Sequence, residues 1–377
     1  MSCFLHSKKI ANRHRLSGHG GGRMLSANSE TGEQMRLTLE VTKERLKEIR
    51  KECEFYCPAC GQKVMLKIGE IIIPHFAHVR KNDCDVFSEG ETAIHLKGKH
   101  LLYSWLQSQK IPTLLEPYLK RIRQRPDLLV KNNEKYYAIE FQCSPITKRL
   151  LDKRNQGYQA VDVTPIWFPK TVGQVFSGAR KVRLTPFTQQ FIKSASCISF
   201  DVENRCFWHF NHLVHISGNQ FIATVKNISL KEQQFQSLSL KEEINYELYD
   251  EIWQIEKIRY LQNRVRFNKR GLKDPFLKES YDEKIMLGLI PNWIGIPMSE
   301  VQSKHSVEWQ LLAVLLMKSI GRTDVYHYFH SKYPQYRITK KEFQYYVDFL
   351  CEHNPKLEWE DLEGSIFSSL VYNYFEL

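Results

Sequence analysis

The stretch "RPDLLVKNNEKYYAIEFQCSP", residues 125–145, puts one carboxylate at the start of an apolar segment and a second inside the next. The pattern predicts strands at about 127–130 and 136–142, and the turn "KNNEK" between them predicts an antiparallel pair. Asp127 and Glu140 would then lie close together on one face. Neighbouring carboxylates repel each other unless a cation separates them, and a hard divalent ion such as Mg²⁺ (or Mn²⁺) takes oxygen ligands of this kind.

The segments on either side complete an α-β-β-β-α-β unit, which we assign to residues 87–175. An amphipathic helix is expected at about 91–108 and a strand at about 113–119. A helix around 146–160 and the strand "VTPIWF" follow the carboxylate pair. Spacings of four residues put polar side chains on single helix faces, namely Glu91, His95 and Lys99 on the first helix and Arg154 with Tyr158 on the second. Each face is either part of a site or an ordinary helix surface.

This pattern resembles the PD-(D/E)xK, or restriction-endonuclease-like, nucleases. "PD" at 126–127 and "EFQ" at 140–142 match their two-part motif, and the element order matches their core. The resemblance implies that Asp127 and Glu140 hold a Mg²⁺ ion that activates a water against a phosphodiester. It also implies supporting groups: Glu91 and His95 beside the metal, and Lys99, Arg154 and Tyr158 toward phosphate. Gln142 stands where the family has a lysine; it can position a water or a phosphate but carries no charge, so cleavage stays open.

Residues 53–84 are rich in Cys and His. "CPACG" at 57–61 forms a tight turn that presents Cys57 and Cys60, "PHFAH" adds His75 and His78, and Cys84 follows. Two Cys on one turn and two ligands from a second segment predict a tetrahedral structural Zn²⁺ site. If 71–78 is extended, the two His point to opposite faces, and we expect His78 with Cys84, with His75 as the alternative. The other interpretations are buried thiols beside an ordinary His, or a redox CxxC.

Composition narrows the class of protein. The 377-residue chain carries 54 Lys+Arg against 42 Asp+Glu, a net charge of +12 that favours a polyanionic partner such as nucleic acid. No signal peptide opens the sequence, and the longest apolar run, 311–317, is too short to cross a bilayer. We therefore expect a cytoplasmic protein without a membrane partner. Nine cysteines in such a chain favour thiols or a metal site over disulfides.

Two basic stretches are candidate DNA contacts. "LKRIRQRP" places Lys120, Arg121, Arg123 and Arg125 directly before Asp127. "KIRYLQNRVRFNKRGLK", residues 257–273, has seven basic residues and no acid, interleaved with Tyr260 and Phe267. Lys and Arg would neutralise phosphates and the aromatic rings could stack on bases. The alternative is a solvated helix face whose aromatic residues point into the core.

The rest of the chain is expected to form an α+β multidomain protein. Residues 1–23 read as a tail outside the fold, with translation starting at Met24. Residues 24–86 hold the zinc-knuckle hairpin, a strand from Met35, a helix "TKERLKEIRKE" capped by Thr42 and a strand at 71–73. Residues 176–377 begin with the strand-rich segments "CISFDV", "RCFWHF" and "FIATVKNISL" and continue as a helical domain. Its first helix has an apolar stripe made of Ile244, Leu248, Ile252 and Ile255.

In combination, CPxC, HFAH, E-x3-H-x3-K, PD, ExQ and R-x3-Y resemble the competence protein CoiA family, and "NWIGIP" at 292–297 is similar to its C-terminal region. The resemblance implies a bacterial factor of natural transformation, acting when incoming single strands are recombined. Three hypotheses follow. The chain is a Mg²⁺-dependent nuclease on single-stranded or branched DNA, a catalytically silent DNA-binding accessory of recombination, or a scaffold that recruits a recombinase or other competence proteins.

Overall fold

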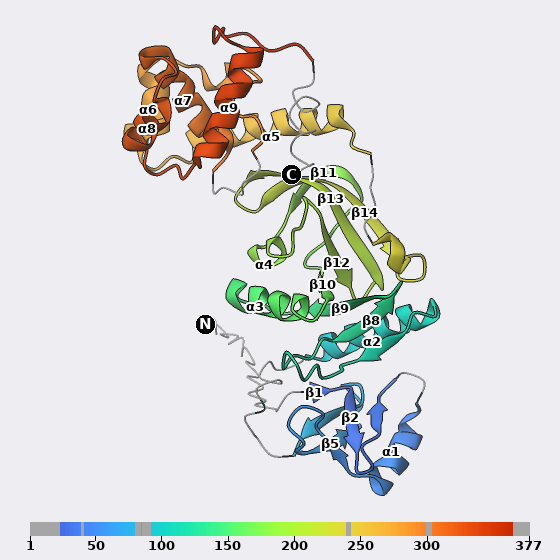
Figure 1. The fold of residues 1–377 in the computed structure, drawn as a ribbon. Helices are drawn as coiled ribbons and strands as arrows, with labels where there is room; N and C mark the ends of the chain where they lie inside the picture. Colours follow the sequence, from blue (N-terminus) through green and yellow to red (C-terminus); the bar gives the residue numbers. More distant parts are fainter. Residues whose placement is uncertain are drawn as a thin grey trace, which may run out of the picture. The chain divides into compact units, whose positions relative to one another are not determined.

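The computed structural model describes residues 23–38, 41–79, 84, 92–238, 243–298 and 304–364 (Figure 1). Glu91 and the tail at 1–22 lie outside the described residues. The chain divides into two compact units: the first runs to Ile139 and includes Arg154–Pro165, and the second comprises Glu140–Lys153 and the chain from Ile166 onward. No helix among the described residues is long and apolar enough to span a bilayer. The fold class is α+β with several sheets.

An antiparallel sheet and one helix form the N-terminal part of the first unit. The strands are β1 (Arg23–Met24), β2 (Ser26–Ser29), β3 (Gln34–Arg36), β4 (Phe55–Tyr56), β5 (Lys63–Lys67) and β6 (His75–His78), in the order β1-β6-β5-β4-β2-β3. Helix α1 (Lys43–Glu52) begins where predicted, and the Thr42 side chain accepts a hydrogen bond from the amide of Arg45, as expected of an N-cap. Arg23, assigned to the tail, instead pairs with β6.

Two predicted strands in this region differ from the structure. The strand expected from Met35 onward ends at Arg36. Residues 71–73 are not a strand: Ile71 is 95% exposed, and the extended segment begins only at His75. Three consecutive β-branched residues favour a strand by propensity, but propensity is weak where no neighbouring strand pairs with the segment.

The predicted α-β-β-β-α-β order of the next segment is confirmed. Its elements are α2 (Ala93–Ser108), β7 (Thr113–Leu115), β8 (Leu128–Asn132), β9 (Lys135–Gln142), α3 (Lys148–Gln159) and β10 (Val163–Pro169), with the strand order β10-β9-β8-β7. Strands β8 and β9 pair antiparallel from Leu128 with Ile139 to Asn132 with Lys135. The two turn residues, Asn133 and Glu134, both have positive φ, the conformation of a type I′ hairpin. Strand β7 stops at Leu115, short of the predicted 119, because Glu116 has φ +50° and Pro117 follows.

The second unit begins with a four-stranded antiparallel sheet. Strands β11 (Gly178–Arg183), β12 (Cys197–Asp201), β13 (Cys206–Ser217) and β14 (Gln220–Ser229) lie in the order β11-β14-β13-β12, with the short helix α4 (Pro186–Gln189) beside them (Figure 1). This confirms the predicted strand-rich segment. Helix α5 (Tyr246–Arg266) packs Tyr249 and Trp253 on this sheet, against Val214, Ile216 and Ile222.

The predicted apolar stripe on this helix is only partly right. Ile244 and Ile252 pack against the sheet, but Ile255 is 45% exposed, because the two aromatic side chains fill the face next to it. Large aromatic residues bury more apolar area per residue than isoleucine, so they set the orientation of the helix.

The C-terminal part of the second unit is helical, as predicted. It contains α6 (Pro275–Asp282), α7 (Ser306–Ile320), α8 (Val325–Lys332) and α9 (Lys340–His353), and the 3-10 turns η2 (Phe235–Ser237), η3 (Gly271–Lys273) and η4 (Leu287–Leu289). Its core is built around Trp293, Trp309, Phe329, Phe343 and Tyr346. Gly295 of "NWIGIP" has φ +88°, and a Cβ there would approach the Val307 Cβ to 2.8 Å, so this close turn requires glycine.

Candidate functional site

The CPACG turn has the geometry of a metal-binding knuckle. The amide of Gly61 donates to the carbonyl of Cys57 (2.9 Å), and the Cys57 amide donates to the Gln62 carbonyl (2.8 Å). Gly61 has φ +71°, a conformation that glycine adopts without strain. The turn brings Cys57 and Cys60 to one point between β4 and β5. It does not open a helix, the position expected of a thioredoxin-like CxxC.

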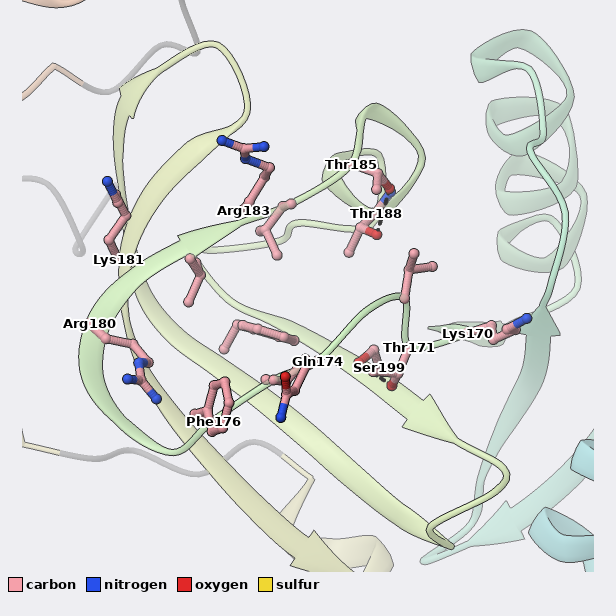
Figure 2. Close-up of a pocket in the computed structure, with 15 residues that line it drawn as sticks. Lys170, Thr171, Gln174, Phe176, Arg180, Lys181, Arg183, Thr185, Thr188 and Ser199 are labelled. Carbon is pink, nitrogen blue, oxygen red and sulfur yellow. Dashed lines mark hydrogen bonds between the residues drawn. The ribbon is translucent and has the colours of Figure 1, made fainter. Parts of the chain in front are cut away.

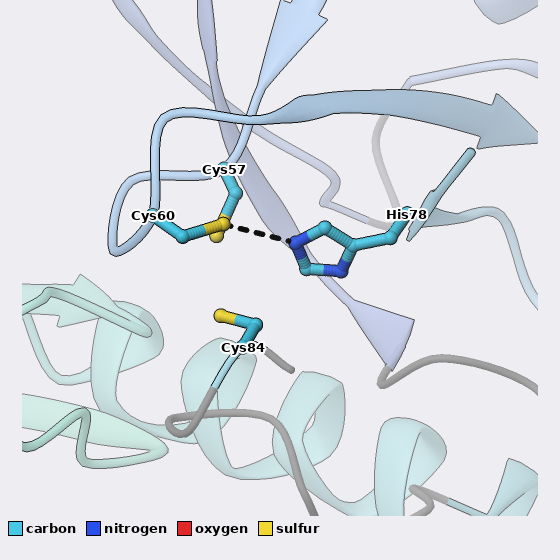
Figure 3. A group of neighbouring side chains, drawn as sticks. All are labelled: Cys57, Cys60, His78 and Cys84. Carbon is cyan, nitrogen blue, oxygen red and sulfur yellow. Dashed lines mark hydrogen bonds between the residues drawn. The ribbon is translucent and has the colours of Figure 1, made fainter. Parts of the chain in front are cut away.

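Four of the five predicted ligands meet at this point (Figure 3). The ligand atoms of Cys57, Cys60, His78 and Cys84 all lie within 4.8 Å of one another, and His78 Nε2 is 3.3 Å from Cys60 Sγ. The choice of His78 over His75 therefore agrees with the geometry. His75 is three residues earlier on β6, so it faces the other side, where its Nδ1 lies 2.9 Å from the Ile73 carbonyl.

The donor set suits Zn²⁺. Three sulfurs and one imidazole nitrogen form the closed shell typical of structural zinc. Burial raises the pKa of the Cys57 thiol to about 12, and a bound cation would have to offset that effect to hold the thiolate. Burial also acts on His78, but there it lowers the pKa of the ring, which keeps the ring in the neutral form that a metal needs. The residues present therefore fit zinc.

A second group of polar residues surrounds Asp127. This residue precedes β8, and its side chain is 11% exposed. His95 and Lys99 lie one turn apart on α2, and each approaches a different oxygen of the carboxylate. His95 Nε2 lies 3.0 Å from Oδ2, and Lys99 Nζ lies 3.7 Å from Oδ1. The helix face predicted from the four-residue spacing therefore does converge on Asp127.

Glu116 completes this group, and the sequence analysis missed it. It follows β7 directly and is fully buried. Its carboxylate forms an ion pair with Lys99 and another with Arg125, whose Nη1 lies 3.1 Å from Oε2. The amides of Leu25 and Ser26 donate to the same Oε2 at 2.8 and 3.3 Å. An acid after an apolar strand and before a proline, as in "LLEP", is the one signal that would have singled it out.

The negative charge of Glu116 is balanced by basic residues of the same group. Burial alone would raise the pKa of Glu116, but Arg125 and Lys99 together outweigh burial and lower it. Lys99 is completely buried, so its ammonium meets a carboxylate rather than solvent. The phosphate contact that we predicted for Lys99 stays a prediction. We call Lys99, Glu116, Arg125, Asp127 and His95 the Glu116 network.

The remaining predicted catalytic residues belong to the second unit. Glu140 and Gln142 lie on β9 and are both buried. The Gln142 side-chain amide donates to the Ser144 carbonyl at 2.8 Å, and the Gln142 carbonyl accepts from the amide of Lys170, also at 2.8 Å. The Gln142 carboxamide oxygen still has capacity to accept a bond. The cation that we predicted between Asp127 and Glu140 stays a prediction.

Arg154 and Tyr158 lie together on α3. The Arg154 Nη2 donates to the Tyr158 hydroxyl at 3.1 Å and to the Arg125 carbonyl at 3.2 Å. Tyr158 is fully buried and packs with Ala138 and Val163, so this ring is part of the core of the first unit. Their predicted contacts with phosphate stay predictions.

The two basic stretches differ in how much charge they present. In the first stretch, Lys120, Arg121 and Arg123 are exposed, whereas Arg125 forms an ion pair with Glu116. In the second, the buried Lys257 donates to the carbonyls of Pro291 and Ile294 at 3.2 Å, and Arg264 pairs with Glu308 and Asp274.

The aromatic residues of the second stretch also divide. Tyr260 donates its hydroxyl to the buried Glu308, whereas Phe267 is exposed. For Tyr260 the structure agrees with the alternative in which the aromatic residues point into the core. Lys257 and Arg264 are also bonded inside the fold, because the helical core needs these polar groups to satisfy one another. Arg259, Arg266, Lys269, Arg270 and Lys273 are the basic residues of the stretch that remain exposed, and Arg259 forms an ion pair with Glu256.

Comparison with known proteins gives a consistent result. Residues 38–87 match the model of "Competence protein CoiA, N-terminal domain", and residues 91–243 match "Competence protein CoiA, nuclease-like domain". Competence protein CoiA of Bacillus subtilis (strain 168) is 32% identical over 183 residues, or 48% of this chain and 49% of that protein. The chain thus aligns with about half the length of this curated relative. No solved structure matches the chain.

Proposed function

The chain belongs to the competence protein CoiA family, and from this premise we propose that it processes DNA in natural transformation at a metal-dependent site of its nuclease-like domain. The observation that carries the proposal is the position of Asp127. Its carboxylate is nearly buried, and His95 and Lys99 of one helix face reach its two oxygens. Buried carboxylates with such partners cluster at functional sites.

The proposed cation, Mg²⁺ or Mn²⁺, is held by Asp127 and Glu140. The pairing of β8 with β9 supports this assignment, because Leu128 pairs with Ile139, and these two residues are the immediate neighbours of the two acids. When bound, the ion would polarise a phosphodiester and lower the pKa of a coordinated water. His95 would hold the Asp127 carboxylate in place by donating a hydrogen bond from Nε2 to Oδ2. Gln142 would accept a hydrogen bond from the water through its free carboxamide oxygen.

The DNA strand in this proposal reaches the site across the exposed basic residues of "LKRIRQRP". Lys120, Arg121 and Arg123 can neutralise phosphates without reading sequence. The Cys/His cluster has a structural role, because a hairpin of this size has too small a core to fold without a metal. Glu91 as a further metal-shell acid, a single-stranded or branched substrate, a recombinase partner and a cytoplasmic location remain part of the same proposal.

A second candidate function is DNA binding without cleavage, in recombination. One observation favours it: the family's lysine is replaced by Gln142, and the amide of this residue is already bonded to a backbone carbonyl. A neutral side chain supplies no charge to stabilise the transition state of phosphodiester cleavage. The protein would then use the same surface to hold strands for a partner.

Cleavage assays with defined substrates distinguish the two functions. Purified protein is incubated with end-labelled single-stranded, duplex and branched DNA in Mg²⁺, Mn²⁺ or EDTA, beside Asp127→Asn and Glu140→Gln. The matched control is Glu134→Gln, an exposed acid in the hairpin turn that joins the same two strands. The nuclease proposal expects metal-dependent products that fall at least about 100-fold in both site variants and persist in the control. Binding without products in any metal would support the second function instead.

A further inference from the structure

A cavity of about 140 Å³ lies in the second unit, and none of the residues of the Cys/His cluster or the Glu116 network line it (Figure 2). The segment 170–176 leaves β10, touches β12 through a bridge between Lys170 and Phe200, and leads into β11. The cavity lies between this segment, β11 and the residues before α4. Its floor is apolar and is formed by Val175, Val182, Leu184 and Phe210.

The charge of the lining is entirely positive. Lys170, Arg180, Lys181 and Arg183 line the cavity, and no acidic residue does. Lys181 is neutralised by Glu256, 2.6 Å away on α5. Among the described residues, the other three form no ion pair. Unpaired cations around a concave surface favour an anionic ligand.

Arg180 is the cation best placed for such a ligand. It lies two residues from Val182 on β11, so both side chains leave the same face of the strand, which is the face of the apolar floor. Lys181 and Arg183 leave the opposite face. Lys170 lies at the other end of the segment 170–176, and its side chain points away from Arg180 and from the cavity (Figure 2). Arg180 is therefore the cation on the face of the apolar floor.

An exposed aromatic ring stands beside Arg180. Phe176 is 52% exposed, and the guanidinium of Arg180 lies 5.1 Å from the centre of its ring. An aromatic face next to a cation is the arrangement on which nucleic-acid bases stack in single-strand binding proteins. A cavity of about 150 Å³ admits a single six-membered aromatic ring, so the space suits one planar base.

Neutral polar groups border the same space. Thr171 and Ser199 share a hydrogen bond of 2.8 Å between their hydroxyls, and Thr185 and Thr188 share one of 3.0 Å on another side (Figure 2). Hydroxyl groups both donate and accept, so they can bond the edge of any base. The lining thus combines phosphate contacts, a stacking face and base-edge contacts without a pattern specific to one base.

We propose that this cavity binds one nucleotide of single-stranded DNA, with the base against Phe176 and the adjoining phosphate on Arg180. A base-paired nucleotide is excluded because its faces are covered by the stack and its edge by the partner strand. The inference deepens the proposed function, on which the choice of DNA as the ligand rests. The cavity is separate in sequence from Asp127 and Glu140. Its residues still belong to the segment that matches the nuclease-like domain.

Binding measured without cleavage tests this inference. Anisotropy of a fluorescent oligothymidine is followed in EDTA over a series of salt concentrations, for the full chain and for Phe176→Ala, Phe176→Trp and Arg180→Gln. We expect Phe176→Ala to lower affinity by about 5-fold to 150-fold, and Phe176→Trp to retain it, because a larger ring keeps the stacking face. Arg180→Gln should reduce the salt slope by about 0.7, the value for one phosphate contact on a single strand.

The controls are matched in chemistry and lie in the same unit. Tyr328→Ala removes another exposed ring, and Lys231→Gln removes another exposed cation, so neither should change affinity. Unchanged binding in both Phe176→Ala and Arg180→Gln overturns the inference, as does an equal loss on single-stranded and duplex DNA. Displacement of the oligomer by thymidine monophosphate at equal concentration would also overturn it, in favour of a free-nucleotide site.

The same assay separates this inference from the proposed function. Asp127→Asn should bind the oligomer normally in EDTA, because no metal step is involved. If the parent chain does not cleave DNA but Phe176→Ala loses binding of the oligomer, the result supports the cavity and refutes the nuclease. If Phe176→Ala cleaves DNA normally and binds the oligomer with unchanged affinity, the result refutes the cavity and supports the nuclease.

Discussion

The Cys/His cluster and the Glu116 network are both groups of charged or metal-binding side chains, yet they are built on opposite principles. In the first, four donor atoms lie within 4.8 Å of one another. In the second, two carboxylates share the cations of Lys99 and Arg125 and the imidazole of His95. A set of electron donors needs a cation from outside, whereas Glu116 already has two cations of the protein beside it.

The difference also concerns distance along the chain. The Cys/His ligands all come from residues 57–84, and the knuckle that presents two of them is a single turn. The Glu116 network joins α2, the ends of β7 and β8, and backbone amides 90 and 91 residues away at Ser26 and Leu25. Counting acidic residues in a motif is therefore a poor guide to a metal site unless the nearby cations are counted as well.

Removing two thiols should have the largest effect. In Cys57→Ser/Cys60→Ser we expect loss of bound zinc and of the hairpin it holds, because structural zinc contributes on the order of 10 kcal/mol to the folding of small domains. Zinc content by atomic absorption and hydrogen exchange over residues 55–78 measure both. The matched control is Cys53→Ser/Cys351→Ser, which removes two exposed cysteines outside the cluster. One zinc per chain in the double-site variant would contradict the assignment.

The Glu116 network should respond next most strongly. Lys99→Met leaves the buried Glu116 with one fewer cation, and breaking a buried pair costs about 3–5 kcal/mol in the free energy of unfolding. Urea denaturation measures this change. Lys131→Met is the matched control, because its pair with Glu134 is exposed and should contribute about 1 kcal/mol or less. Replacing the carboxylate as well should recover part of the lost stability. If Lys99→Met/Glu116→Leu is no more stable than Lys99→Met, the loss does not come from leaving the buried Glu116 carboxylate without this cation.

Acid should weaken the helix that carries this network. Burial lowers the pKa of His100, beside Lys99, to about 4, so the unfolded chain takes up a proton near its ordinary pKa while the folded chain does not. Stability is then complete above about pH 6.5 and falls as the pH drops toward 4, by about 3 kcal/mol for this group. The lowered pKa of Glu116 acts in the same direction at still lower pH.

Unfolding at pH 7 and at pH 4.5 tests this sign. His100→Gln should lose less stability between the two values than the parent chain, whereas His327→Gln, a change at an exposed histidine, should behave like the parent. An equal acid loss in His100→Gln and the parent would exclude burial of this ring as the source.

Features that depend on near neighbours in the chain could be predicted from the sequence. The helix after Thr42, the hairpin at 133–134 and the α-β-β-β-α-β order follow from caps, turns and periodicity, and all are present. Strand alternation predicted that His75 and His78 face opposite sides, and the cluster contains His78. These properties are decided within a few residues, where covalent geometry leaves few options.

Which polar side chains already have hydrogen-bond or ion-pair partners depends on the packing of distant segments. The sequence analysis gave Lys99, Lys257 and Arg264 as candidate DNA contacts. In the structure each of them bonds to a carboxylate or a carbonyl inside the fold. Glu116 gave almost no signal, yet it joins segments far apart in the chain. The cavity beside Phe176 likewise exists because three separate segments meet there. Burial of a charge is set by partners distant in sequence, and a local pattern carries no information about them.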